Sequence, residues 1–286
     1  MASTQPCKGP TPYLVGDDWF QMLDSGKDVC AVFFDIQKAF DTIPHHALMQ
    51  KLQHTGLNNH ILHWICSYLT NREQQVLVNG ATSKSLPVIS GVPQGSVLGP
   101  LLFLIYIDGV TSTPLSDGSK MTLYADDTLL YRRIETPQDY QKLQNDINSI
   151  EEWVSVNHLR FNVTKCKSML ISRKRNPLPR PVLSLCGEVL EQVECFKYLG
   201  VLLTSDLTWS KHTEFICAKA KKLLGMIYRR FSEYSNPDTL LHIYESMFDH
   251  IWSMPPKYGT HTSKRISDCL RESKSLHLGC VERTMT

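Results

Sequence analysis

The period of the hydrophobic pattern changes several times along this 286-residue chain, and each change predicts a different element. Residues 29–34 form an unbroken apolar run that ends at Asp35, which predicts a strand buried on both faces. Apolar residues then recur at helical spacing over 46–68, which predicts a long helix with a break near Gly56.

Two adjacent carboxylates stand between two further apolar runs. Residues 121–123 precede Tyr124-Ala125-Asp126-Asp127 and residues 129–131 follow it. This pattern predicts a tight strand–turn–strand hairpin with the acids at its tip. Side-by-side carboxylates repel each other, so the tip is either a solvated turn or a place that holds a cation.

The remaining elements follow from the same reading. It predicts irregular chain over 1–16, helices at 17–23, 101–110, 137–156, 211–231 and 237–250, a β-hairpin from 75–78 and 86–89, and strands at 168–171 and 197–203. Residues 251–286 show little periodicity and are assigned no fold.

Composition adds a core and a charge asymmetry. The chain is 42% hydrophobic and 20% charged, which excludes a disordered protein. Residues 1–157 carry 10 Lys or Arg against 16 Asp or Glu, whereas residues 158–231 carry 14 against 5. An acidic front and a basic block suit a protein that gathers metal in one place and a polyanion in another. Chance segregation of surface charge is the alternative.

The nine cysteines are odd in number and contain no Cys-x-x-Cys pair, which argues against a disulfide framework and a zinc ribbon. No signal peptide is visible, and the longest apolar stretch, 97–107, is too short to span a bilayer. We therefore expect an intracellular protein with no membrane partner; nucleus and cytoplasm are not distinguished.

A third carboxylate brings the candidate chemistry together. Asp35 closes a buried strand, where an acid is costly unless it is paired or metal-bound. If this strand lies beside the hairpin, Asp35 and Asp126 would bridge two Mg²⁺ ions, which prefer hard oxygen ligands. Two such ions activate a hydroxyl and stabilise a leaving pyrophosphate, as in nucleotidyl transfer. Between the acids, the glycine-punctuated loop 90–100 lets backbone approach a ligand closely.

These segments carry a family resemblance. Residues 34–41, 91–100, 124–127, 159–167 and 196–200 resemble the successive core motifs of reverse transcriptases. The amino-acid sequences of these motifs are similar to those of LINE-type (non-LTR) retrotransposon enzymes, and the resemblance covers about residues 17–250. The resemblance implies an α/β (α+β) fold, namely a polymerase palm with an antiparallel sheet backed by helices, followed by a helical thumb.

The resemblance also implies the catalytic and metal-binding residues. Asp35, Asp126 and Asp127 would be the catalytic triad and would hold two Mg²⁺ ions, with Mn²⁺ as a possible substitute. The carbonyl of Ile36 would add to the metal shell.

Four residues would bind the nucleotide, by the same resemblance. Phe40 would be an aromatic gate that selects deoxynucleotides, with core packing as an equal alternative. Gln94 and Gly95 would face the incoming nucleotide and template. Lys165 would approach the departing pyrophosphate, with a surface salt bridge as the alternative.

The later motifs would hold the nucleic acid. Tyr198, Leu199 and Gly200 would shape the primer grip. The basic residues of the thumb helix would contact the duplex backbone; they are Lys219, Lys221, Lys222, Arg229 and Arg230. The implied partners are an RNA template, a DNA primer and dNTPs.

The implied domains are an N-terminal remnant at 1–28, a palm with part of the fingers at 29–210, a thumb at 211–250 and a degenerate tail at 251–286. Only about 30 residues precede Asp35, too few for the family's basic fingers module. Two functions therefore stay open: an RNA-directed DNA polymerase, or a catalytically incompetent retrotransposon remnant that binds nucleic acid. Phe40 and the glycine loop argue against a viral RNA-dependent RNA polymerase, which also carries paired acids.

Overall fold

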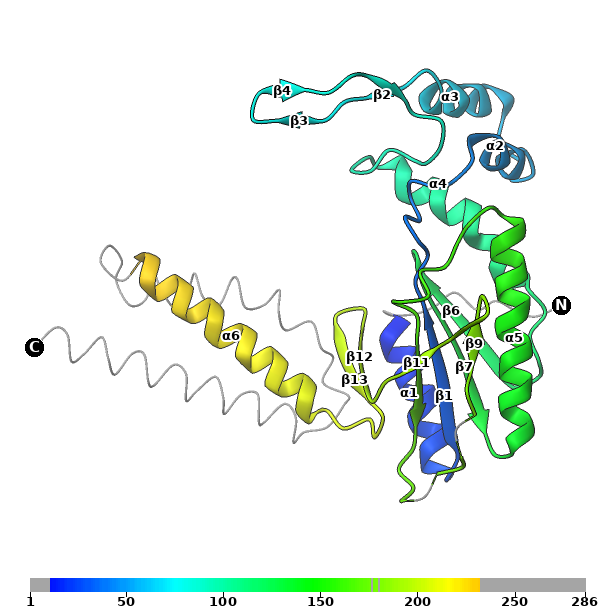
Figure 1. Cartoon of the computed structure of the whole chain (residues 1–286), viewed down its shortest axis with the longest axis vertical. Helices are drawn as coiled ribbons and strands as arrows, with labels where there is room; N and C mark the ends of the chain where they lie inside the picture. The colour runs from blue at the N-terminus through cyan, green and yellow to red at the C-terminus, as the bar shows by residue number, and fades with distance from the viewer. Residues whose placement is uncertain (1–10, 176, 180, 232–286) are drawn as a thin grey trace, which may run out of the picture. The chain divides into compact units, whose positions relative to one another are not determined.

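The computed structural model describes residues 11–231 except 176 and 180, and the chain divides into two compact units, Met1–Glu194 and Cys195–Thr286 (Figure 1). The elements of the first unit are α1 (Thr11–Asp24), β1 (Asp28–Phe34), α2 (His45–Gln53), α3 (Asn59–Leu69), β2 (Glu73–Gln74), β3 (Leu77–Val78), β4 (Ala81–Thr82), β5 (Leu86–Pro87), α4 (Leu98–Ile107), the 3-10 helix η1 (Asp108–Ser112), β6 (Ser119–Tyr124), β7 (Asp127–Ile134), α5 (Pro137–Val156), β8 (Lys167–Ile171), β9 (Ser184–Leu185), β10 (Glu188–Val189) and β11 (Glu191–Gln192). Those described in the second unit are β12 (Cys195–Tyr198), β13 (Val201–Thr204) and α6 (Ser210–Phe231).

A five-stranded sheet in the order β11-β8-β1-β7-β6 forms the centre of the first unit. Strand β1 is antiparallel to both of its neighbours, β7 and β8, and β6 is antiparallel to β7. Every residue of β1 is buried, as expected for an apolar run in the middle of a sheet. The short edge strand β11 runs parallel to β8, and the other pairings confirm the predicted antiparallel sheet.

Helices cover both faces of this sheet (Figure 1). On one face, Val32 and Leu130 belong to the same buried cluster as Leu143 of α5. On the other, the ring of Trp19 in α1 packs edge-on against Tyr131 of β7, with centroids 5.8 Å apart. The alternation of a strand sends successive side chains to opposite faces, so each face has its own helix.

Two helix predictions need correction, and a third is confirmed. The helix expected at 17–23 begins at Thr11, so residues 11–16 are helical rather than irregular. The run over 46–68 forms two helices with Gly56 between them at φ 75°, as the predicted break required. The helix expected at 101–110 begins at Leu98, because Pro100 is tolerated in a first turn, and it continues as η1.

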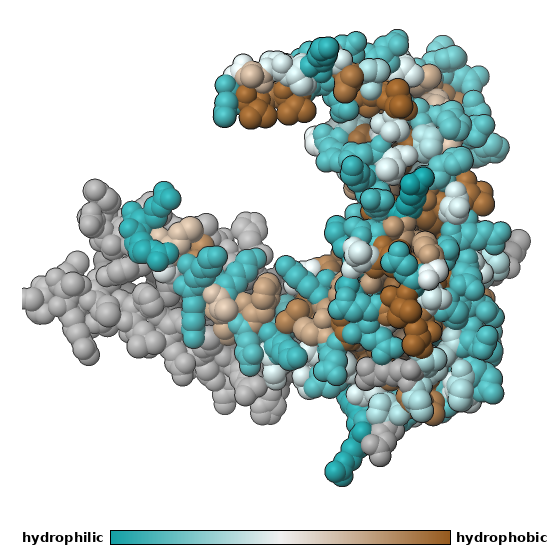
Figure 2. Space-filling view, in the orientation of Figure 1, coloured by the Kyte–Doolittle hydropathy of each residue, from teal (hydrophilic) through white to brown (hydrophobic). Residues whose placement is uncertain are grey.

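The predicted hairpin after α3 forms with a different register. Asn79 and Gly80 have φ of 49° and 83° and make a two-residue turn, so Leu77–Val78 pairs with Ala81–Thr82 instead of with 86–89. Leu86–Pro87 pairs further down with Glu73–Gln74. Apolar surface gathers on this hairpin (Figure 2). The side chain of Leu77 in β3 is 69% exposed.

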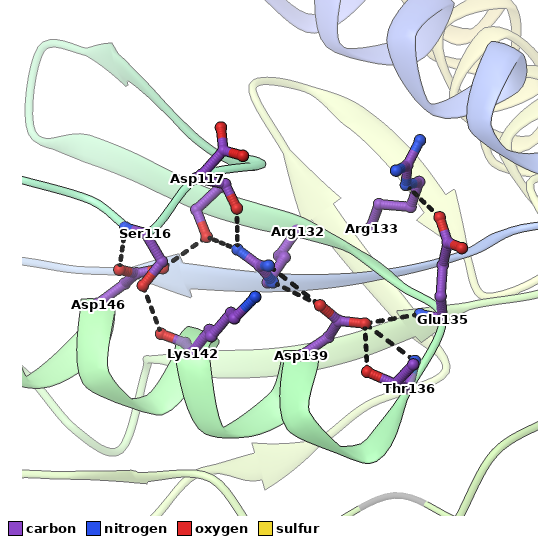
Figure 3. Close-up of polar contacts among 10 residues, drawn as sticks. Ser116, Asp117, Arg132, Arg133, Glu135, Thr136, Asp139, Lys142 and Asp146 are labelled. Atoms are coloured by element: carbon purple, nitrogen blue, oxygen red, sulfur yellow. Dashed lines mark hydrogen bonds and ion pairs between the residues drawn. The ribbon is translucent and has the colours of Figure 1, made fainter.

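A buried arginine ties the sheet to α5 (Figure 3). The guanidinium of Arg132 donates to the carboxylate of Asp139 at 3.0 Å, to the carbonyl of Asp117 at 2.8 Å and to the hydroxyl of Ser119 at 2.9 Å. Asp139 also accepts the backbone N–H of Thr136, which closes a capping box at the start of α5. Burial raises the pKa of Asp139, but the hydrogen bonds to the ionised form outweigh that effect and lower its pKa to about 2.

The second unit begins with a hairpin where one strand was predicted. The strand expected at 197–203 is wrong because the chain reverses at Leu199 and Gly200, whose φ values are 46° and 85°. Helix α6 matches the prediction at 211–231 within one residue and buries Ile216, Ala220 and Ile227 on one side. The helix predicted at 237–250 lies outside the described residues.

No helix within the described part of the chain combines the length and the apolar character needed to cross a membrane.

Candidate functional site

The end of β1 places Asp35 beside the acidic hairpin. Asp35 follows Phe34, and Phe34 pairs with Thr128, the neighbour of Asp127 in β7. The tertiary structure therefore brings Asp35 close to Asp126 and Asp127, which lie far from it in the sequence. The predicted metal site depended on this placement of the Asp35 strand beside the hairpin.

The hairpin tip is a two-residue turn. Tyr124 pairs with Asp127, so Ala125 and Asp126 form the turn itself, and Ala125 has a left-handed φ of 55°. Asp126 and Asp127 are both partly buried, while Tyr124 is exposed. The acids therefore sit at the tip, with Asp127 as the first residue of β7.

The Asp127 carboxylate lies within reach of the charges of Asp126 and Asp35. Burial raises the pKa of Asp127, and the charges of Asp126 and Asp35 raise it further. Carboxylate oxygens are hard donors of the kind that Mg²⁺ and Mn²⁺ prefer. In the portion of the chain that the structure describes, no three His, Cys, Asp or Glu side chains converge into a complete ligand set.

One cation already faces Asp35. The ammonium of Lys165 lies 3.5 Å from the Asp35 carboxylate, and the lysine side chain is 66% exposed. The alternative of a surface salt bridge is thus present in the structure. Such exposed pairs contribute about 0.2–1 kcal/mol, so the contact leaves the lysine able to change partners.

The backbone around Asp35 is held by the segment before β8. The N–H of Asn162 donates to the Asp35 carbonyl at 2.8 Å, and Ile36 forms an antiparallel bridge with Phe161. The N–H of Asp35 donates to the sulfur of Cys166 at 3.3 Å. Burial raises the pKa of the Cys166 thiol to about 11, so the group is neutral at physiological pH.

The glycine loop packs on the chain that follows Asp35. The N–H of Gly91 donates to the carbonyl of Ile43 at 2.8 Å, and that of Val92 donates to Phe40 at 2.7 Å. A Cβ on Gly91 would lie 2.8 Å from backbone atoms of Asp41, whereas one on Gly95 would meet nothing within 4 Å. Gly91 therefore serves a close approach within the protein, and Gly95 lies open to the outside.

Asp41 braces this loop. Its carboxylate accepts from the side-chain amide of Gln94 at 2.8 Å, and its carbonyl accepts from the hydroxyl of Ser90. Pro44 occupies the N-cap position of α2. Gln94 is exposed and held by this contact.

A pocket of about 720 Å³ opens beside the loop. Lys38, Asp41 and Gln94 line one part of it, and Arg72 and Glu73 line another. It lies between the glycine loop and the base of the β2–β5 hairpin, within the first unit.

Phe40 packs on the core without being fully buried. Its ring stacks on Phe103 of α4 with centroids 4.8 Å apart. The core-packing role is therefore present in the structure, and the partly exposed ring leaves the proposed gate untested.

The remaining predicted residues belong to the second unit. Tyr198 is buried, and Leu199 with Gly200 forms the turn of the β12–β13 hairpin. The five basic residues predicted on the thumb helix are all exposed: Lys219, Lys221, Lys222, Arg229 and Arg230.

Two groups escaped the sequence analysis. The contact of Cys166 with Asp35 could not be predicted from the sequence, because the two residues are 131 positions apart and Cys166 is marked only by its place in a motif. Arg132 did carry one: strand alternation puts it on the same face as Leu130, and a buried arginine requires a carboxylate partner.

Comparison with known proteins adds the following similarities. A family model described as reverse transcriptase (RNA-dependent DNA polymerase) matches residues 14–203. The RNA-directed DNA polymerase from mobile element jockey of Drosophila melanogaster is 30% identical over 198 residues, which are 67% of this chain and 21% of that protein. The probable RNA-directed DNA polymerase from transposon X-element of the same species is 32% identical over 240 residues, 82% of this chain and 26% of that protein.

Among solved structures, the telomerase from Candida tropicalis in complex with a TWJ fragment of telomeric RNA has a TM-score of 0.50. The alignment covers 88% of this chain and 44% of that one at 10% identity, so it shows a likeness of fold alone. The chain spans about a quarter of the length of the two curated relatives, from 21% to 26%.

Proposed function

This chain belongs to the reverse transcriptase family, and from that premise we propose that it carries the palm of an RNA-directed DNA polymerase that adds dNTPs to a primer 3′-hydroxyl. The observation that supports this most directly is the pairing of β1 with β7, which puts Asp35 beside the hairpin, where the charges of Asp126 and Asp35 raise the pKa of Asp127. Its curated relatives are polymerases of non-LTR mobile elements, and reverse transcriptases generally use divalent metal ions.

Asp35, Asp126 and Asp127 would hold two Mg²⁺ or Mn²⁺ ions, with the carbonyl of Ile36 as a further ligand. When bound, divalent ions supply activation of the primer hydroxyl and stabilisation of the leaving pyrophosphate. The carboxylates bring four lone-pair sites each and no competing donors while ionised. Their position at the ends of β1 and the β6–β7 hairpin keeps them on rigid elements, as such a site requires.

The nucleotide would lie against the glycine loop. Gln94 and Gly95 would face the base and the template, with Asp41 keeping the Gln94 amide in place. Phe40 would stand beneath the sugar, supported from behind by Phe103. Lys165 would leave Asp35 to meet the pyrophosphate, since its present contact is weak.

The nucleic acid would be held mainly by the second unit. Tyr198, Leu199 and Gly200 would guide the primer, and the basic side of α6 would contact phosphates. An RNA template, a DNA primer and dNTPs are the partners of this proposal. An intracellular location belongs to it as well, because these substrates are found inside cells.

A primer-extension assay tests the proposal, with an RNA template, a labelled DNA primer, dNTPs and Mg²⁺. We expect extension by the parent chain and none by Asp126→Ala. Asp117→Ala is the matched control, because it removes an exposed acid just before β6 and should leave extension intact. Extension by Asp126→Ala equal to that of the parent would refute the assignment.

The exposed basic side chains of α6 favour a second candidate, a non-catalytic nucleic-acid binder. Phosphate contacts release counterions, so log K should fall with log salt, and each lost lysine should reduce the slope by about one. Replacing Lys221 and Lys222 together by alanine should therefore lower the slope by about two, measured by fluorescence anisotropy with a labelled duplex. Binding of this kind without extension would favour the second candidate over the first.

A further inference from the structure

The peptide of Asp35 is held from both sides by one short segment of chain. Its carbonyl accepts the N–H of Asn162 at 2.8 Å, and its N–H donates to the sulfur of Cys166 at 3.3 Å. The same thiol lies 3.8 Å from the Asp35 carbonyl as a donor. A further hydrogen bond joins the same two segments, because the N–H of Gln37 donates to the carbonyl of Arg160 at 2.8 Å.

Cys166 has no exposed surface, so water cannot take over this contact. A buried N–H that loses its partner costs about 1–3 kcal/mol, and the peptide would rotate to recover one. Asp35 is the first residue beyond β1, where the sheet ladder no longer fixes the backbone on both sides. The thiol therefore stands where a small rotation of the peptide would turn the Asp35 carboxylate.

We propose that Cys166 is a positioning residue for the metal site: its thiol fixes the Asp35 peptide so that the carboxylate points toward the Asp126–Asp127 turn. Groups that orient metal ligands change metal affinity or activity by about 10–100-fold when they are removed. A cysteine suits this place because its side chain is small enough for a fully buried position and has both a weak donor and a weak acceptor. This inference rests on the proposed function.

The variants separate positioning from packing. Cys166→Ala removes the sulfur, Cys166→Ser keeps a donor and an acceptor, and Cys166→Val fills the space with apolar atoms should the alanine variant fail to fold. Cys30→Ala is the matched control, because Cys30 is a buried thiol in β1, five residues before Asp35. It creates a similar cavity in the same buried cluster and leaves the Cys166 sulfur in place.

The first measurement is the dissociation constant for Mn²⁺, obtained from the EPR signal of the free ion without nucleotide. We expect Cys166→Ala and Cys166→Val to weaken binding on the order of tenfold, Cys166→Ser to lie near the parent, and Cys30→Ala to match the parent. The second measurement is amide hydrogen exchange, where Asp35 should lose protection in Cys166→Ala relative to the amide of Ala31.

Two results would overturn the proposal in distinguishable ways. If the parent binds Mn²⁺ no more tightly than Asp126→Ala, the metal site of the proposed function fails and this inference fails with it. If the parent binds Mn²⁺ but Cys166→Ala and Cys30→Ala are equal in Mn²⁺ affinity and in Asp35 protection, only the positioning role is wrong.

Discussion

Two glycines of one loop should respond very differently to the same substitution. Gly91 and Gly95 both have left-handed backbones, with φ of 87° and 78°. A Cβ on Gly91 would lie 2.8 Å from the Cα and carbonyl of Asp41 and from the carbonyl of Phe40, whereas a Cβ on Gly95 would enter open space. Alanine at either position carries the conformational cost, and alanine at Gly91 also carries the steric one.

The magnitudes follow from these contacts. The left-handed conformation costs a residue with a Cβ about 1–2 kcal/mol. Overpacking against atoms that must shift adds about 1–3 kcal/mol, and here those atoms are backbone, which cannot rotate away. We therefore expect Gly95→Ala to lose about 1 kcal/mol and Gly91→Ala about 3 kcal/mol. For a unit of this size the melting temperature should fall by about 2–4 °C and about 6–12 °C respectively.

Thermal unfolding followed by circular dichroism measures both variants against the parent chain. A Gly91→Ala chain that cannot be obtained folded, beside a folded Gly95→Ala chain, agrees with the reasoning. Equal melting temperatures for the two variants would show that the loop does not approach residues 40–41 as closely as the structure has it.

Two further predictions concern buried charge. Arg132→Met should destabilise the protein by about 3–5 kcal/mol, because it leaves the Asp139 carboxylate without its cation. The control variant Arg133→Met breaks an exposed ion pair with Glu135 and should cost under about 1 kcal/mol. Similar midpoints of urea unfolding for the two variants would contradict this prediction. Burial lowers the pKa of His212, and the Nδ1 atom of its neutral ring accepts the N–H of Leu202 at 3.1 Å. The stabilisation by this neutral histidine is therefore present above the unfolded-state pKa of about 6.5 and is lost as the pH falls through the lower folded-state pKa. Hydrogen-exchange protection of the Leu202 amide should therefore fall between about pH 7 and pH 5, and protection independent of pH would refute the role of His212.

Much of the local structure could be read from periodicity. Helix α5 has the bounds predicted for it, 137–156, because a capping residue such as Thr136 directly before a proline is a local signal of a helix start. The β12–β13 hairpin was missed, since Leu199-Gly200 lacks the Asn-Gly pattern that marked the turn after β3. The predicted pairing in the first hairpin was wrong because Asn79-Gly80 makes a two-residue turn, whereas strands at 75–78 and 86–89 would be joined by a longer loop, and loop length sets the register.

The residues of the candidate site could be predicted from the sequence, whereas the contacts among them could not. Asp35, Asp126 and Asp127 could be predicted as candidate site residues from the sequence, because each ends or interrupts an apolar run, where a carboxylate is costly. Tertiary packing placed β1 beside β7, so that the charges of Asp35 and Asp126 raise the pKa of Asp127. It also decided that Cys166 holds the Asp35 peptide and that Asp41 holds Gln94. These contacts join residues 53 to 131 positions apart, and distance along the chain carries no information about distance through a packed sheet.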